Sequence, residues 1–471
     1  MTLAAVPVSK NESIQQVGYQ QAAAQLGGPT DRASDDHHPI DLVTAFRLSG
    51  ANNLQIALAA ERTRQAQARL QGANALWLPS LTGGVGYTSH NGQIQDTRGD
   101  VIDVRRNSLF VGGGPTVGNI GIAGEGTQPR MTMGLSLADA FFTPLAERQN
   151  ARGTNAALTT TFNDTLFQVA LAYTDLLQAQ AQLAIAREAV GNAQELDKLV
   201  DSNVRAGKAP PADGLRARAE FADRRRQVHQ AEEGVRVTST ELVRLLRLDP
   251  SVTLVSAEEQ PVAVTLVEIE IPLPRLIEQG LMQRPELAEQ RAMLGATLAR
   301  LRQEQWRPLI PSVQLGYGAG GFGGGTGSSV SNFGGRGDFD AMLVWELRNL
   351  GFGNYALSKE RASVNTQAAL SGAQTSDRIA SEVARAYYQA RQRKLQIDEG
   401  RDQVKAAADA VPLNFKGIRG GDLRAIEAQQ AIQMLVYART QYLAALVDYN
   451  RAQFSLLRAV GLPPDGAACR P

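Results

Sequence analysis

The sequence predicts an α+β membrane protein that is internally duplicated, with four transmembrane β-strands per chain and long α-helical hairpins. Three observations support this fold class. Short segments alternate apolar with small or polar residues at a period of two, long tracts carry a helical apolar pattern, and both recur in the same order in the two halves of the 471 residues. No run of about 18 apolar residues occurs, so a transmembrane helix is excluded.

Composition narrows the class of protein further. A formal net charge of +1 argues against a nucleic-acid partner. The single cysteine, Cys469, can form no internal disulfide, and this leaves the redox compartment open. The N-terminus lacks a basic start, and Pro7 and Lys10 break its apolar stretch, so either an export signal was removed or the protein stays inside. Residues 1–38 are expected to be poorly ordered.

The first ordered element is predicted to be helical and to run from about residue 41 to the residue before Pro79. Asp41 is its candidate N-cap, because a short carboxylate accepts hydrogen bonds from the free amides of a first turn. Apolar residues recur along this segment at helical spacing.

Four segments then alternate with a period of two, and each is about 8 to 10 residues long with one apolar face. This pattern is typical of a membrane-spanning strand that turns its apolar face to lipid, although an ordinary half-buried strand gives the same signal. The apolar positions are Leu81, Val85 and Tyr87; Met131, Met133, Leu135 and Leu137; Val313, Leu315 and Tyr317; and Phe339, Ala341, Leu343, Trp345 and Leu347. Glycine-rich connections of about 40 residues after Tyr87 and about 20 after Tyr317 are expected to be surface loops.

A long helical tract follows each pair of strands. The first is predicted over about 154–204, with a break at 205–214 and a second tract over 215–248. The later copy is predicted as a helix over about 371–415, a break at 416–422 and a return helix over 423–460. These tracts are too long for a globular core and suit two antiparallel hairpins with coiled-coil packing.

The order helix, strand, loop, strand, long helix, tip and return helix occurs twice. "FQVALAYTDLLQ" aligns with "SEVARAYYQARQ", which pairs Tyr173 with Tyr387. The duplication divides the chain into a first repeat at 39–250, a linker at 251–272, a second repeat at 273–464 and a tail at 465–471.

The chain resembles the TolC-like outer-membrane efflux proteins, also called outer membrane factors, over about residues 40–464. The motifs that carry the resemblance are "IDLVTAF" (40–46), "RPEL" (284–287), the two "PS" and "GY" strand starts, "WELRNLGFG" (345–353) and "GDLRAIEAQ" (421–429). The resemblance implies a homotrimer in which four strands per chain form a shared 12-stranded barrel in the cell outer membrane, with the helical hairpins forming a tunnel in the periplasm. Independently, four strands cannot close a barrel, and an open sheet edge is not tolerated in lipid.

The function implied by the resemblance is the exit duct of a tripartite efflux pump or a type I secretion system. Its partners would be a periplasmic adaptor, an inner-membrane pump and outer-membrane lipid. The cargo, whether small molecules, metal ions or polypeptides, is left open. The alternative is a non-transporting periplasmic coiled-coil adaptor or scaffold protein, which the two pairs of alternating strands argue against.

The hairpin tips are the candidate functional residues, because the resemblance implies that they meet the adaptor. The tip residues singled out for this contact are Arg205, Gly207, Arg419, Gly420 and Gly421. The glycines also suit the positive φ of a tight turn between helices, so plain turn chemistry is the competing interpretation.

The pore mouth is assigned to Asp422, Arg424 and Glu427. A ring of carboxylates at a constriction favours cations, and Glu427 stands at one position where the resemblance implies an acid. Arg424 stands where a second acid is expected, which argues against a strong acidic gate. Asp422 is equally suited to cap the last helix, and Arg424 and Glu427 have the spacing of a helical ion pair.

Motifs of enzymes fail on their context. Gly318 to Gly323 fits G-x-G-x-x-G, but no helix is predicted after it. The histidines have no partners at metal-ligand spacing, and no nucleophile with a base is apparent. The sequence therefore predicts no enzyme activity, no catalytic residue, no metal and no cofactor.

Overall fold

The computed structural model describes residues 37–78, 80–116, 131–258 and 260–463. The predictions for residues 1–36, Pro79 and the tail at 465–471 fall outside these residues. The chain divides into two compact units: Met1–Ala59, Ala157–Leu287 and Thr375–Pro471 form one, and Ala60–Ala156 and Ala288–Gln374 form the other. Below, they are called the hairpin unit and the sheet unit.

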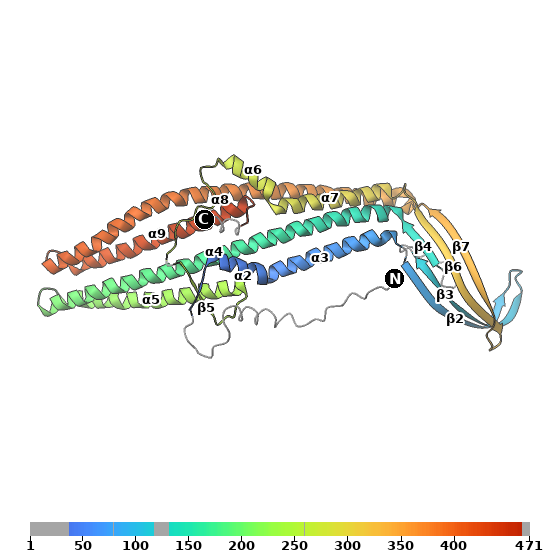
Figure 1. Cartoon of the computed structure of the whole chain (residues 1–471), viewed down its shortest axis with the longest axis horizontal. Helices are drawn as coiled ribbons and strands as arrows, with labels where there is room; N and C mark the ends of the chain where they lie inside the picture. The colour runs from blue at the N-terminus through green and yellow to red at the C-terminus, as the bar shows by residue number, and fades with distance from the viewer. Residues whose placement is uncertain (1–36, 79, 117–130, 259, 464–471) are drawn as a thin grey trace. The chain divides into compact units, whose positions relative to one another are not determined.

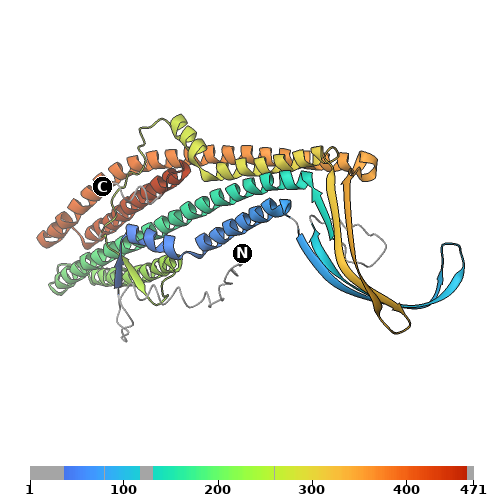
Figure 2. The ribbon, with the colours of Figure 1, turned by 45° about the vertical axis from the view of Figure 1, so that its right-hand side comes forward.

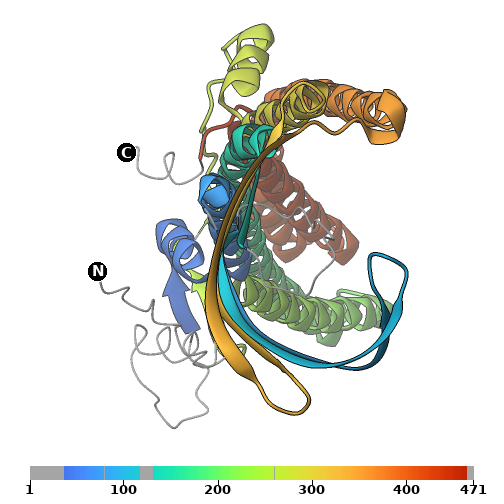
Figure 3. The same ribbon diagram turned by 90° about the vertical axis from the view of Figure 1, so that its right-hand side faces the viewer.

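The sheet unit contains five strands and most of two helices. The strands are β2 (Ser80–Gln95), β3 (Val101–Thr116), β4 (Met131–Ser136), β6 (Ser312–Thr326) and β7 (Ser331–Val344). The helical elements are α3 (Leu54–Asn74), η1 (Ala75–Trp77), α7 (Pro285–Trp306) and η2 (Arg348–Gly351). Figure 3 shows the long strands as one curved sheet.

The five strands occupy four rows. β3 and β4 both pair antiparallel with β6, one after the other: Gly113 lies opposite Ala319, and Met131 lies opposite Tyr317. The two strands therefore form a single row that is interrupted by the residues between them. The rows run in the order β2, β3 with β4, β6 and β7, which agrees with the predicted four strands per chain.

The predicted strand boundaries and long loops are wrong. β3 lies where a loop was expected, and β2 and β6 extend well beyond Tyr87 and Tyr317. The two connections that lie wholly within the described residues, at 96–100 and 327–330, are short. These strand segments were missed because they are rich in glycine, which has a low intrinsic propensity for strands. Here the neighbouring rows supply the hydrogen bonds and the close contacts: Phe333 lies 2.6 Å from where a Cβ on Gly323 would be.

The strand register places the apolar positions of all rows on one face. Val85 pairs with Val111, Tyr87 with Leu109, and Val313 with both Leu135 and Leu343. Val85, Tyr87, Phe339 and Leu343 are 72%, 62%, 70% and 57% exposed. The positions on the opposite face are mostly glycine, serine and threonine, with exceptions that include Phe110, Phe322 and Met342 and, on β7, Arg336, Asp338 and Asp340. The alternation predicted from the sequence is therefore continuous across the sheet.

The hairpin unit contains two helical hairpins, which Figure 1 shows as α4 with α5 and α8 with α9. α4 (Leu137–Arg205) and α8 (Phe352–Gly420) each have 69 residues and run through both units. Their return helices are α5 (Pro211–Leu246) and α9 (Ala425–Ala459). The predicted hairpins are confirmed, but the long helices start earlier than predicted, and Pro144 is buried inside α4 without ending it.

Smaller elements complete the hairpin unit. They are β1 (His37–Ile40), α2 (Leu42–Asn52), β5 (Thr253–Ser256) and α6 (Leu273–Gln283). Asp41 caps α2 as predicted, because its carboxylate accepts a hydrogen bond from the Thr44 amide at 3.2 Å. β1 pairs in parallel with β5, so order starts within the segment expected to be poorly ordered, and the linker contributes a strand. The pairing is between residues far apart in sequence, which a local pattern does not reveal.

Both repeats bury the same kinds of residue in their hairpins. Tyr173 and Tyr387, aligned by the duplication, are 4% and 8% exposed and belong to two separate apolar clusters, one per hairpin. The "RPEL" segment also has a structural role within this chain: Arg284 is 4% exposed and forms ion pairs with Glu286 and Glu382. No helix among the described residues is both long and apolar enough to cross a membrane.

Candidate functional site at the hairpin tips

The first tip is a tight turn closed by Gly207. α4 ends at Arg205, and α5 begins at Pro211. Gly207 has φ +73° and donates its amide to the Val204 carbonyl at 3.0 Å, while the Lys208 amide donates to the Asn203 carbonyl at 2.8 Å. These two bonds are those of a Schellman motif, in which a residue with positive φ ends the helix.

The second tip repeats this geometry around Gly421. Gly421 has φ +86° and donates to the Ile418 carbonyl at 3.2 Å, and the Asp422 amide donates to the Gly417 carbonyl at 2.9 Å. Gly207 and Gly421 are thus equivalent, and Arg205 and Arg419 each lie two residues before them. Gly420 still belongs to α8, so its predicted role in the turn differs from that of Gly421.

The two turns differ in length and in their N-caps. Residues 206–210 join the first pair of helices and residues 421–424 the second, so the first tip is longer, as predicted. α9 has Arg424 at its N-cap position, with no capping bond from the side chain. The alternative that Asp422 caps the last helix is therefore wrong: Asp422 takes part in the turn through its backbone amide.

The two tip arginines make different ion pairs. Arg205 pairs with Asp201 of its own helix at 2.6 Å, and its side chain is 80% exposed. Arg419 pairs with Glu195 of α4 at 2.6 Å and so joins the second hairpin to the first. Both pairs are open to water, so each contributes at most about 1 kcal/mol to stability. The side chains therefore keep most of their capacity to bind a partner.

Among the ion pairs of the described residues, none joins Arg424 to Glu427, although their spacing allows a helical ion pair. The Glu427 amide donates to the Arg424 carbonyl at 3.1 Å, which is a backbone contact. Arg424 is exposed and Glu427 is half-buried. The spacing of Arg424 and Glu427 thus predicted two residues that do contact each other, but the contact is between backbone atoms and not between the charged side chains.

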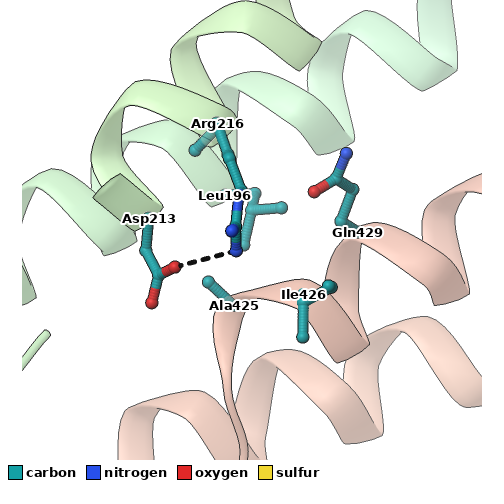
Figure 4. A pocket seen from close by; sticks show the side chains of 7 residues that line it. Leu196, Asp213, Arg216, Ala425, Ile426 and Gln429 are labelled. Carbon is teal, nitrogen blue, oxygen red and sulfur yellow. Dashed lines mark hydrogen bonds and ion pairs between the residues drawn. The ribbon is translucent and has the colours of Figure 1, made fainter. Parts of the chain in front are cut away.

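A small pocket lies between the two tips, and sequence reasoning missed it. Figure 4 shows Leu196, Asp213 and Arg216 of the first hairpin facing Ala425, Ile426 and Gln429 of the second. Arg216 and Asp213 form an ion pair at 3.4 Å, and the Gln429 amide donates to Glu220 at 3.0 Å. The signal that could have found most of these residues is the alignment of the two tips, because both return helices line the pocket with residues near their starts.

The apolar contacts beneath the pocket hold the two tips together. Leu196, Val200 and Ala217 of the first hairpin pack against Val411, Phe415, Ile418, Ala428, Ile432 and Leu435 of the second. Leu423 packs so closely on Gly417 that a Cβ there would lie 2.5 Å from the leucine side chain. The tips are therefore defined by packing as well as by turn chemistry.

Alternatives of other classes find no support at these positions. Gly318 to Gly323 lies inside β6 and is followed by β7, so the G-x-G-x-x-G pattern does not start a nucleotide-binding helix. Within the described residues, no group of three or more His, Cys, Asp and Glu side chains is placed to hold a metal ion.

Comparison with known proteins agrees with this architecture. Residues 144–246 match the family model described as outer membrane efflux protein. These residues cover most of α4 and all of α5, so the match includes the first tip. No curated protein sequence matches the chain.

Three solved structures illustrate the similarity. The outer-membrane channel OprN is 19% identical, with 92% of this chain and 98% of that chain covered and a TM-score of 0.75. The MtrE outer-membrane channel of Neisseria gonorrhoeae is 16% identical, with coverage of 92% and 93% and a TM-score of 0.70. The CmeC outer-membrane channel of Campylobacter jejuni is 16% identical, with coverage of 93% and 91% and a TM-score of 0.69.

The chain has the fold of the TolC-like outer-membrane channels. The resemblance predicted from the sequence and the predicted combination of a β-sheet with long helical hairpins are thereby confirmed, whereas the shared trimeric barrel stays a prediction. In this TolC-like fold the sheet unit corresponds to the β-barrel part, and the long hairpins correspond to the helical tunnel. The roles of the individual tip residues stay predictions.

Proposed function

We propose that this chain is the outer-membrane exit duct of a tripartite efflux pump or a type I secretion system. It would conduct its cargo passively across the periplasm and the outer membrane, with the sheet unit in the cell outer membrane and the helical hairpins in the periplasm. The observation that carries the proposal is the four-row sheet, whose continuous apolar face is exposed and whose outer rows, β2 and β7, each have an edge that no other described strand pairs with.

A sheet with two free edges in lipid leaves backbone groups without hydrogen-bond partners, which costs several kcal/mol per group. Four rows cannot close on themselves, because the smallest membrane barrels have about eight strands. Three copies would join β7 of each to β2 of the next and close a barrel of about 12 rows. The proposal therefore includes a homotrimer.

The tryptophans support a membrane boundary at the helix end of the sheet. The chain has three tryptophans. Trp77 and Trp306 precede β2 and β6, Trp345 follows β7, and they are 52%, 52% and 56% exposed. Tryptophan is enriched where a membrane meets water. Its position at three of the helix–strand junctions fits the periplasmic side of a barrel.

The tips would bind a periplasmic adaptor, through which an inner-membrane pump supplies the energy. Arg205 and Arg419 present exposed guanidinium groups beside Gly207, Gly420 and Gly421, where a partner's backbone can approach closely. Of the mouth residues, Asp422 and Arg424 belong to the second tip, and Glu427 lies in the first turn of α9. The exposed Arg424 next to this mouth disfavours a strongly acidic gate. The proposal assigns no enzyme activity to the chain.

The oligomeric state and the location test the duct. The protein should fractionate with the outer membrane and, after extraction in detergent, have three times the chain mass of 50.5 kDa, or 151.5 kDa. A monomer that is soluble without detergent would instead support the adaptor or scaffold alternative, which the exposed apolar sheet face disfavours.

The adaptor contact needs a separate experiment. Arg205→Ala and Arg419→Ala should each reduce capture of the cognate adaptor by the purified trimer. Arg187→Ala is the matched control, because Arg187 also lies on α4 in an exposed ion pair, with Glu232 at 3.4 Å, but far along the helix from the tip. Equal capture by all three variants would remove the arginines from the adaptor site. Cysteines at 205 or 419 that are cross-linked between copies should block export.

A further inference from the structure

The hairpin formed by β2 and β3 continues beyond the end of the sheet. The last pair between β3 and β6 joins Arg106 to Thr326, whereas β2 and β3 stay paired up to Gln95 and Val101. Residues 91–105 therefore form a two-stranded segment that pairs with no third strand of the described chain, here called the outer ribbon. Figure 2 shows it extending beyond the turn that joins β6 to β7 and bending away.

Asn107 fixes the level at which the sheet ends. It is 8% exposed, and its side-chain amide donates to the Gly327 carbonyl at 2.7 Å. Its side-chain oxygen accepts a hydrogen bond from Ser89 Oγ at 2.8 Å, and the Gly327 amide donates to the Arg105 carbonyl at 3.2 Å. The short turn between β6 and β7 is thus attached to the base of the outer ribbon.

The apolar face changes sides at this level. Below it, the apolar residues of β2 and β3 are mainly the odd-numbered ones, including Val85, Tyr87, Leu109 and Val111, and Phe110, which pairs with Gly86, is an even-numbered exception. Within the outer ribbon the even-numbered residues are apolar: Ile94 pairs with Ile102, and Val104 pairs with Gly92. The odd-numbered face becomes polar, with Asn91, Gln93, Gln95, Asp103 and Arg105, and keeps only Val101 at its last pair. The register has no shift, so the pattern itself has reversed.

This reversal indicates which face of the outer ribbon is exposed to water. A polar odd-numbered face indicates that the surface which faces lipid lower down faces water here. The even-numbered face continues the side that carries Gly86, Thr88 and Ser108 below, which three-fold closure turns toward the channel axis. Ile102 is 45% exposed in the single chain, and an isolated two-stranded hairpin is only marginally stable in water.

We propose that the apolar face of the outer ribbon packs against the ribbons of two further copies of this chain and forms a cap over the outer mouth of the channel. The proposal rests on the proposed function, because only closure around a three-fold axis brings the three faces together. At that height the surfaces facing the axis are the other two ribbons, so a second copy is the partner that the geometry offers. Gly92, with φ +152°, gives the ribbon a backbone conformation that side-chain-bearing residues rarely adopt at its base.

Disulfide trapping tests the cap. In a Cys469→Ala background, Ile102→Cys should form a cross-linked dimer in the purified trimer on mild oxidation, and Ile94→Cys provides a second position on the same face. Asp103→Cys is the matched control, because it neighbours Ile102 but lies on the polar face. A short bismaleimide serves where the sulfurs approach without meeting disulfide geometry.

The outcomes separate this proposal from the duct itself. Cross-linking at 94 or 102 but not at 103 supports the cap. A trimer without cross-links at 94 and 102, or with equal cross-linking at 103, overturns the cap and leaves the duct standing. A protein that is not trimeric overturns the duct. As a readout in planar bilayers, Ile102→Asp should raise the channel conductance, and Asp103→Asn should leave it unchanged; equal conductance in both variants would also contradict a cap.

Discussion

The two junctions at which a strand leads into a long helix occupy the same place in the two repeats, yet they are built differently. After β4, α4 begins at once at Leu137. After β7, the chain passes through Asn349 and Leu350, both with positive φ, before α8 begins at Phe352. The duplication has thus preserved the direction of the chain at the two junctions but not the local backbone.

Partly buried polar contacts account for the regular first junction. Asp139 in the first turn of α4 accepts hydrogen bonds from Arg307 at 2.6 Å and from Gln303 at 2.7 Å. Arg307 also pairs with Glu304 at 3.0 Å. The second junction has an exposed ion pair, Arg348 with Glu346 at 3.4 Å, and a local hydrogen bond from the Arg348 amide to Asn354 Oδ1 at 2.8 Å, and it leaves Leu350 91% exposed. Tertiary contacts fix the first junction, whereas local backbone conformations shape the second.

The largest expected effect is loss of the Asp139 carboxylate. Asp139→Ala should destabilise the protein by about 1–2 kcal/mol, because Arg307 loses one of two partners in a partly buried site. The Glu304 contact that remains, and the partial exposure of Asp139, keep the loss moderate. Urea unfolding in detergent, with a double-mutant cycle against Arg307→Met, measures it. A coupling near zero would mean that the ion pair does not stabilise the junction.

Acid should weaken the same junction. Burial raises the pKa of Asp139, but hydrogen bonds from Arg307 and Ser136, the charge of Arg307 and the Gln303 contact outweigh it and hold the pKa below its usual value. A carboxyl with a lowered folded-state pKa contributes stability above its unfolded pKa, and this contribution disappears as the pH falls through the folded pKa. The stability difference between wild type and Asp139→Asn should therefore shrink below about pH 4. A constant difference down to pH 2 would contradict this assignment.

Glycine at Leu350 should have a smaller effect, of opposite sign. Leu350→Gly should stabilise the fold by up to about 1 kcal/mol. A left-handed conformation costs a residue with a Cβ about 1–2 kcal/mol, and glycine removes this cost but increases the conformational entropy of the unfolded chain, which offsets part of the gain. Ala140→Gly, inside α4 at the first junction, is the control and should destabilise by about 1 kcal/mol. Parallel unfolding curves decide; destabilisation by both changes would show that Leu350 makes a contact worth more than its strain.

The smallest effect should come from the exposed pair. Glu346→Gln should change stability by no more than about 0.5 kcal/mol, because its partner Arg348 stays hydrated. A loss as large as that of Asp139→Ala would erase the distinction between the two junctions.

Local sequence patterns were sufficient to predict most strands, both helical hairpins and the glycines of the tight turns. The apolar alternation identified a segment of every strand of the sheet except β3, the helical periodicity identified both hairpins, and Gly207 and Gly421 have the positive φ expected of tip glycines. β3 was missed because its residues lack apolar alternation beyond Leu109 and Val111 and end in a run of glycines. At the tips, Glu195 and Gln429 could not be assigned, since their partners lie on the other hairpin.

The sequence by itself determined the fold class, the duplication and the two tips, because these depend on period, order and residue type along one stretch of chain. Only the tertiary structure decided that β3 and β4 share one row, that Asp422 closes a turn rather than caps a helix, and that the apolar face reverses beyond Asn107. Each of these depends on which strand or helix lies alongside. Hydrogen bonds and packing between segments distant in the sequence set that arrangement, and no local pattern encodes it.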